Sequence, residues 1–226
     1  YINRLIKALT TVRTNKFSDI NLRRWKEYKD IETDSLWILD KRDSSGVHSA
    51  DYWGNFVPQI PNQLIRRFTK PGEWILDTFA GSGTTLIESN RLGRNCLGIE
   101  LQSKVAKRSK ITIEKEKNDS TSITEIVTGD CTQVDVKSEL KKLGAKSVQL
   151  VIMHPPYHDI IKFSDDPRDM SNAPDVDSFL ELMGRAVDNV KDILDPGRYL
   201  GLVICDKFNK SEWIPLGFLT SQVFTE

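Results

Sequence analysis

The sequence predicts an α/β fold, a Rossmann-like and doubly wound sheet of parallel strands. The first observation is a βαβ unit of nucleotide-binding type from Trp74 to Glu100, in which an apolar strand, a glycine turn, a helix and a second apolar strand follow one another. The second is a continuous apolar run, Val148 to Met153, typical of a buried parallel strand. With 226 residues, 38% of them hydrophobic, the chain is long enough for one domain with a sizeable core.

The glycine turn of the βαβ unit indicates a ligand site. Gly81 and Gly83 let the backbone approach a ligand and adopt conformations that a side chain would forbid. The helix predicted from Thr84 to Leu92 would direct its free N–H groups at that ligand. Glu100, which ends the second strand, stands where a carboxylate can accept hydrogen bonds from a ribose diol. For the glycines alone, a plain structural turn is the alternative interpretation.

The residues around the turn disfavour two common nucleotide sites. A dinucleotide fingerprint needs a third glycine, but two threonines and a leucine follow Gly83. A phosphate-binding P-loop needs a lysine directly after that glycine, and none is present. Asp77, at the end of the first strand, would repel a pyrophosphate and suits a cationic, amine-bearing ligand.

The apolar strand from Val148 to Met153 runs directly into His154-Pro155-Pro156-Tyr157. Neither proline has an N–H group to donate, so the strand cannot continue through them. They form a stiff, extended platform at the carboxyl edge of the sheet, where ligands bind in open α/β folds.

Two motifs resemble those of S-adenosylmethionine-dependent DNA amino-methyltransferases, which methylate N6 of adenine or N4 of cytosine. D-x-F-A-G-S-G-T-T at residues 77–85 is similar to motif I, and the Pro-Pro-Tyr platform is similar to motif IV. The resemblance covers residues from about 45 to 213 and implies a class I methyltransferase fold, S-adenosyl-L-methionine as cofactor, and DNA whose target base is flipped out. By position it assigns catalysis to His154, Pro155, Pro156 and Tyr157, and cofactor binding to Asp77, Phe79, Ala80, Gly81, Gly83, Thr84, Thr85, Glu100, Leu101, Asp130 and Cys131.

A third segment, Asn55 to Pro61, is similar to motif X of the same family, which contacts the methionine end of the cofactor. It precedes a predicted amphipathic helix over residues 62–70 that stops at Pro71-Gly72. An ordinary loop-to-helix junction is the alternative. The order X, I, IV is that of the class whose recognition region follows the catalytic motif. The resemblance adds these residues to the cofactor pocket: Asn55, Phe56, Pro58, Gln59 and Ile60.

The chemistry that the resemblance implies sets the tasks of these residues. The exocyclic amine is a poor nucleophile, so its N–H groups need hydrogen-bond acceptors, here the His154 side chain and the Pro155 carbonyl. Tyr157 would stack on the flipped base in a site that excludes water. At the position of His154 the family usually has Asp, Asn, Ser or Thr, so the choice between adenine and cytosine stays open. A non-catalytic DNA- or cofactor-binding subunit and an RNA N-methyltransferase are the alternative functions.

The rest of the chain is expected to form a basic, partly helical N-terminal arm over residues 1–45 and the methyltransferase domain over 46–226. The arm suits either contact with DNA phosphates or packing through its apolar positions. Within the domain we expect a basic outer helix after Glu100 and a loop over 158–176 that orders around the target nucleotide. The last strands of the sheet are expected to be missing, with an incomplete C-terminus. Further elements are predicted over residues 35–40 (strand), 123–128 (strand), 177–194 (helix capped near Asp177 or Ser178), 195–197 (turn) and 199–205 (strand), followed by a loop and a helix.

The composition indicates which kinds of partner to expect. The net charge is zero, so charge alone does not indicate nucleic acid. Cys96, Cys131 and Cys205 lack metal-ligand spacing, so we expect reduced thiols and no metal. No apolar run reaches the length of a membrane span, and no signal peptide is recognisable. We expect a cytoplasmic, nucleoid-associated protein that acts on DNA, with a separate specificity or restriction subunit as a further candidate partner.

Overall fold

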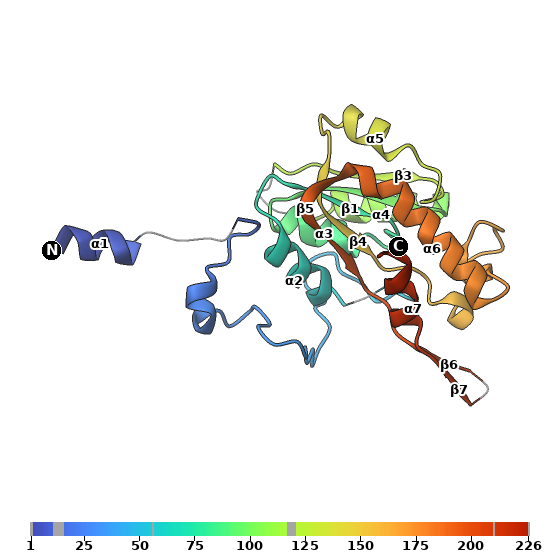
Figure 1. Cartoon of the computed structure of the whole chain (residues 1–226). Coiled ribbons are helices and arrows are strands. Elements are labelled where there is room, and N and C mark those ends of the chain that lie inside the picture. Colours follow the sequence, from blue (N-terminus) through green and yellow to red (C-terminus); the bar gives the residue numbers. More distant parts are fainter. Residues whose placement is uncertain (1, 11–15, 56, 117–120, 210, 226) are drawn as a thin grey trace.

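The computed structural model describes residues 2–10, 16–55, 57–116, 121–209 and 211–225 (Figure 1). Its centre is a five-stranded sheet in the order β3-β2-β1-β4-β5, in which every pair is parallel. The predicted α/β fold with a parallel Rossmann-like sheet is therefore confirmed. The strands are β1 (Trp74–Asp77), β2 (Asn95–Glu100), β3 (Thr124–Thr128), β4 (Val148–Met153) and β5 (Leu194–Leu202).

Helices cover both faces of the sheet, each over its own apolar core (Figure 1). Side chains alternate along a strand, so Ile75 and Leu76 of β1 enter different cores. The core of Ile75 is closed by α2 (Gln59–Phe68), α3 (Thr84–Arg91) and α4 (Ser103–Glu114). The core of Leu76 is closed by α5 (Val136–Lys142), α6 (Val176–Val190) and α7 (Leu216–Val223). The sheet is thus doubly wound, as predicted.

The order of the strands brings two motifs together. β1 and β4 are neighbours, with Leu76 opposite Val151 and Asp77 opposite Ile152. Their carboxyl ends therefore meet at one edge, at the point where the strand order reverses. Ligands bind at such switch points in open α/β sheets. The glycine turn after β1 and the prolines after β4 consequently border the same space.

The strand predicted over residues 35–40 is wrong. This segment is irregular and pairs with no strand of the described chain. Leu36 and Ile38 are 73% and 71% exposed, and the Trp37 ring instead lies against the guanidinium of Arg67. A short apolar run becomes a strand only where a neighbouring strand takes up its backbone N–H and C=O groups.

Two predicted helix starts also differ. α2 begins at Gln59, ahead of the expected start at residue 62. The proline at residue 61 lies in its first turn, where a missing N–H group leaves no bond unmade. α6 is capped by Asp175, whose carboxylate accepts the N–H of Ser178 at 2.8 Å, so the cap is neither Asp177 nor Ser178.

The fifth strand begins earlier and ends earlier than predicted. Its pairing with β4 starts at Leu194 opposite Val148 and resumes at Tyr199 opposite Leu150. Residues 195–197, predicted as a turn before the strand, form an irregularity within it. Beyond β5, where only a loop and a helix are expected, β6 (Lys207–Asn209) and β7 (Glu212–Ile214) form an antiparallel hairpin that projects from the domain near α7 (Figure 1). Strands this short give no recognisable alternation of apolar and polar residues in the sequence.

The N-terminal arm contains α1 (Ile2–Thr10), which lies away from the sheet (Figure 1). Its helical spacing was predicted, but Ile2 and Ile6 are 72% and 52% exposed, so these two positions do not pack against the domain. None of the helices among the described residues combines the length and apolarity needed to cross a membrane.

Candidate active site

A pocket opens at the carboxyl edge of the sheet, where the loops after four neighbouring strands meet. Its empty space is about 790 Å³, with the open mouth included. The wall combines apolar surface with a few polar groups. It contains these predicted residues: Asn55, Phe79, Ala80, Gly81, Thr84, Glu100, Leu101, Asp130, Cys131, His154, Pro155 and Pro156.

The glycine turn has the backbone that its sequence predicts. Gly81 and Gly83 have φ values of 50° and 83°, in the left-handed region that residues with a side chain rarely adopt. A Cβ atom on Gly81 would lie 3.1 Å from the Tyr52 ring, and one on Gly83 would lie 3.0 Å from Ile113. Glycine is therefore required at both positions by conformation and by space.

Glu100 closes the turn from the neighbouring strand. Its Oε2 accepts the N–H of Gly81 at 2.9 Å, and its Oε1 accepts the N–H of Gln102 at 2.8 Å. Burial raises the pKa of this carboxyl, while the two backbone N–H groups act in the opposite direction. Each carboxylate oxygen has a further lone pair, so Glu100 can still accept hydrogen bonds from a ligand.

Asp77 lies behind the pocket wall and not in it. It is 1% exposed, and its Oδ1 accepts the N–H of Phe79 at 2.9 Å. Burial raises the pKa of the Asp77 carboxyl to about 6. Asp77, Gly83 and the fully buried Thr85 support the glycine turn without lining the pocket. The effect of Asp77 on a ligand is therefore indirect.

Asp130 follows β3 and reaches the opposite side of the pocket. Its Oδ1 accepts both the N–H and the hydroxyl of Thr132, each at 2.8 Å. This local turn holds the carboxylate at the pocket edge. The neighbouring Cys131 is buried, and burial raises the pKa of its thiol.

The prolines after β4 carry His154 and Tyr157 into contact with each other. His154 Nε2 and the Tyr157 hydroxyl are 2.8 Å apart, and their rings meet edge to face at 5.5 Å. Burial lowers the pKa of His154 to about 4, so its imidazole is uncharged at neutral pH. Tyr157 lines a smaller cavity next to the pocket, which His154, Pro155 and Pro156 also border.

The predicted motif X residues divide into two groups. Asn55 lines the pocket and donates its side-chain N–H to the Ser82 hydroxyl at 3.1 Å. Pro58, Gln59 and Ile60 lie at the start of α2, outside the pocket wall, and Gln59 accepts the N–H of Asp43 at 3.1 Å. Phe56 lies outside the described residues.

Two aromatic rings that the sequence analysis missed form part of the pocket wall. Tyr52 and Phe163 stack with centroids 6.2 Å apart and planes at 26°. They belong to the loops before α2 and after β4, which are far apart in the sequence. Both loops are polar and lack periodicity, so the only signal was an aromatic residue in each. Other wall residues that were missed are Gly54, Thr78, Ser82, Ile99, Gln102, Gly129, Arg168, Asp169 and Met170.

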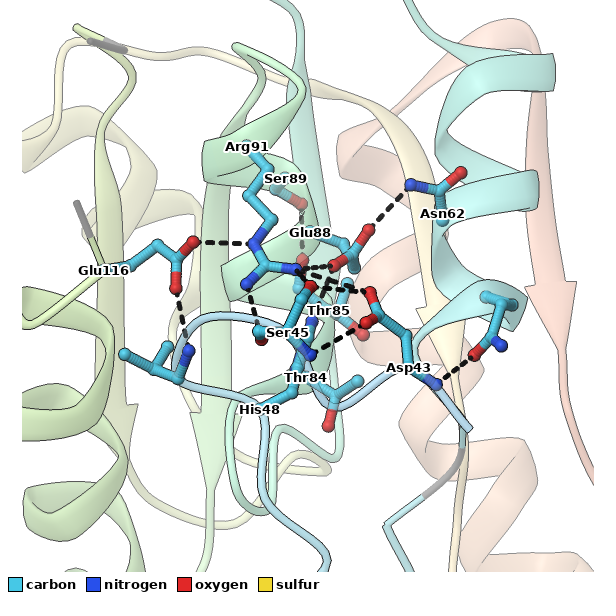
Figure 2. A network of polar contacts seen from close by, with 12 residues as sticks. Asp43, Ser45, His48, Asn62, Thr84, Thr85, Glu88, Ser89, Arg91 and Glu116 are labelled. Carbon is cyan, nitrogen blue, oxygen red and sulfur yellow. Dashed lines mark hydrogen bonds and ion pairs between the residues drawn. The ribbon is translucent and has the colours of Figure 1, made fainter. Parts of the chain in front are cut away.

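The loop that carries Tyr52 is tied to α3 by a network of charged groups (Figure 2). His48 Nε2 lies 2.6 Å from Glu88 Oε1, and both side chains are buried. Asp43, His48 and Glu88 are close enough together to hold a metal ion. However, the Arg91 guanidinium already lies 3.3 Å from Glu88 and 3.6 Å from Asp43. This guanidinium supplies the positive charge, so we assign the cluster a structural role.

Comparison with known proteins agrees with this fold and site. A family model described as DNA methylase matches residues 6–112, and one described as RMKL-like, methyltransferase domain matches residues 65–171. Among solved structures, TrmN from Thermus thermophilus superposes with a TM-score of 0.52 at 16% identity, covering 74% of this chain and 41% of that one. The fold is that of the class I methyltransferases.

Relatives define the family more narrowly. The chain is 35% identical over 100 residues to the type II methyltransferase M2.DpnII of Streptococcus pneumoniae, covering 41% of this chain and 34% of that protein. It is 33% identical over 86 residues to the type II methyltransferase M.MjaII of Methanocaldococcus jannaschii, covering 35% and 16%. In these regions the chain is similar to the DNA amino-methyltransferase family (N6-adenine and N4-cytosine). The matched region spans 34% and 16% of the length of these two relatives.

Proposed function

We propose that this chain transfers the methyl group of S-adenosyl-L-methionine to the exocyclic amine of a flipped base in DNA. The observation that carries the proposal is the convergence of the glycine turn after β1 and of His154, Pro155 and Pro156 after β4 on one pocket. We further propose a role in restriction–modification or related DNA marking, at the nucleoid in the cytoplasm. A separate specificity or restriction subunit is the proposed protein partner.

The wall of the pocket fits this cofactor. Glu100 offers acceptors for a ribose diol, and Asp130 offers a carboxylate for the amino group of adenine. Gly81 allows the chain to approach the ligand closely, and Phe79 supplies apolar contact. The cofactor, when bound, supplies an electrophilic methyl group on a sulfonium sulfur.

The catalytic residues would act by binding, orientation and exclusion of water. An uncharged His154 can accept a hydrogen bond from the target amine, and the carbonyl of Pro155 can accept a second. Tyr157 lies where its ring can stack on the base from the smaller cavity. The two prolines hold these groups on a rigid backbone, which favours a productive approach of the amine to the methyl group.

The first test is incubation with tritiated S-adenosylmethionine and mixed genomic DNA, followed by mass spectrometry of the nucleosides, with the His154→Ala variant as control. We expect N6-methyladenine or N4-methylcytosine from the wild-type protein, and strongly reduced product from the variant. The identity of the product names the base. Tight cofactor binding with no label in DNA would contradict the proposal, and label in RNA would redirect it to an RNA N-methyltransferase.

A further inference from the structure

His158, the residue directly after the Pro-Pro-Tyr motif, has an unusual backbone conformation. Its φ is 53°, in the left-handed region that is unfavourable for a residue with a Cβ atom. Such a conformation persists only where the surroundings hold the residue in place. The His158 side chain is 4% exposed, and its ring lies 6.0 Å from that of the core residue Phe179. It borders neither the pocket nor the smaller cavity.

The contacts of the His158 ring define its protonation. Nε2 lies 2.9 Å from the carbonyl oxygen of Ala173, which can only accept, so Nε2 must carry the hydrogen. Nδ1 lies 3.0 Å from the ammonium nitrogen of Lys207, which can only donate, and 3.4 Å from Asp159 Oδ1, which can only accept. The shorter contact, with Lys207, is made when Nδ1 offers its lone pair. Both contacts are satisfied by one state, the neutral imidazole protonated on Nε2.

Lys207 also contacts the residue that follows His158. It is 5% exposed and forms an ion pair with Asp159, the residue after His158. The Lys207 ammonium holds the pKa of the Asp159 carboxyl below its ordinary value. The buried ammonium of Lys207 lies between the Asp159 carboxylate and the His158 ring. It therefore ties two consecutive residues of the loop after β4 to β6.

The β6–β7 hairpin that starts at Lys207 is otherwise weakly supported. Phe208 and Trp213 lie opposite each other across its two strands and are 74% and 59% exposed. A two-stranded hairpin is marginal by itself, so contacts at its root matter for its position. The hairpin projects from the domain at the end that carries α7 (Figure 1).

From these contacts we infer that His158 and Lys207 are a positioning pair, which holds Tyr157 in its working orientation and couples that orientation to the β6–β7 hairpin. The inference rests on the proposed function. Tyr157 precedes His158 directly, so a change in the left-handed turn at His158 redirects the Tyr157 ring. A contact made by the exposed hairpin would reach Tyr157 through Lys207 and His158.

The first experiment measures kcat, the KM for DNA and the Kd for the cofactor in Lys207→Met. We expect kcat to fall about tenfold or more, because small displacements of a positioned group are costly, with cofactor affinity within about twofold of wild type. Lys142→Met, which breaks an exposed ion pair with Glu139 on α5, is the matched control. A kcat for Lys207→Met equal to that of the control would overturn the inference.

A second pair of variants separates positioning from folding. Asn tolerates the left-handed region, and its amide oxygen can replace Nδ1, so His158→Asn should keep more activity than His158→Ala. In a double mutant, Lys207→Met should lower the kcat of His158→Ala by less than it lowers the kcat of the wild type, because the contact between the two residues is already lost. Additive losses would count against the pair.

A third measurement does not depend on turnover. The chain has three histidines, so the ring nitrogen resonances of His158 can be assigned by comparison with its variants. We expect protonation on Nε2 alone in the wild type and a mixture of tautomers in Lys207→Met. A charged ring, or a proton on Nδ1, would refute the pair. If the wild type methylates no nucleic acid, the proposed function fails, and the pair is then judged by these resonances and by hydrogen exchange of residues 154–160.

Discussion

His154 Nε2 and the hydroxyl of Tyr157 lie 2.8 Å apart, so the residue expected to accept a hydrogen bond from the target amine is already engaged by the residue expected to stack on the base. A base that enters the smaller cavity must take over this contact. Under the proposed function, the two residues would exchange their mutual hydrogen bond for contacts with the substrate.

Replacing Tyr157 by Phe should keep methyl transfer, because the ring remains and His154 Nε2 no longer has to be released from the hydroxyl. Replacing it by Ala should lower kcat/KM by about 10- to 100-fold, the effect of losing one base–aromatic stack. Cofactor binding should be nearly unchanged in both. Steady-state measurement of the rate at which methylated DNA forms checks this. A Phe variant as inactive as the Ala variant would show that the hydroxyl has a role of its own.

The buried His154 should make stability depend on pH. Its pKa is about 4 in the folded protein and 6.5 ordinarily, so between these values the unfolded chain binds more protons than the folded one. Stability due to this group is therefore full above about pH 6.5 and falls as the pH drops towards 4, by roughly 2–3 kcal/mol.

The measurement is the unfolding free energy of wild type and His154→Gln between pH 4 and 8. The difference between the two isolates His154, which matters because the raised pKa of Asp77 acts in the opposite direction over part of this range. A difference that stays constant with pH would contradict the expectation.

Replacing Glu100 by Ala should weaken cofactor binding about tenfold or more, because charge-assisted hydrogen bonds to the ligand are lost. The same change removes the acceptor of the Gly81 and Gln102 N–H groups, so a modest loss of stability should accompany it. Calorimetric titration gives the Kd. Glu139→Ala on α5, whose side chain does not line the pocket, is the control, and equal Kd values for the two variants would count against the assigned pocket.

The contribution of the stacked Tyr52 and Phe163 rings can be tested by adding a single methyl group. A Cβ atom on Gly54 would lie 2.6 Å from the Phe163 ring, whereas one on Gly72 would meet nothing within 4 Å. Both glycines have similar left-handed φ values, 81° and 82°, so alanine costs about 1–2 kcal/mol of backbone energy at each. Only Gly54→Ala should also displace Phe163 and raise the Kd for the cofactor. Equal Kd values would mean that the stacked rings do not contribute to cofactor binding.

Removing the cation of the polar network should unfold the protein more easily (Figure 2). Arg91 pairs with Glu116 at 2.7 Å and also contacts Glu88 and Asp43, so Arg91→Met leaves Glu116 without its cation and removes the guanidinium from beside the other two carboxylates. We expect a loss of about 3 kcal/mol, as for other broken buried pairs. Urea unfolding at pH 7 measures it. Arg185→Met, which removes an exposed pair with Glu181, should cost less than about 1 kcal/mol.

The sequence by itself determined the framework of this protein. Apolar runs such as Val148 to Met153, punctuated by glycines and prolines, predict the strands and the turns, because burial and backbone conformation are local properties that a few neighbouring residues decide. The motifs after β1 and β4 carried the resemblance to the family. Topology then required their meeting, since parallel strands present their carboxyl ends at one edge.

Only the tertiary structure decided how the site is completed. Nothing near Tyr52 or Phe163 in the sequence indicates that the two rings stack over the pocket. The same holds for Lys207, whose partner His158 lies on another segment. Such contacts depend on where distant segments come to rest after the core has packed. A strand predicted over residues 35–40 failed for the same reason, because its pattern was suitable but no neighbouring strand was there to pair with it.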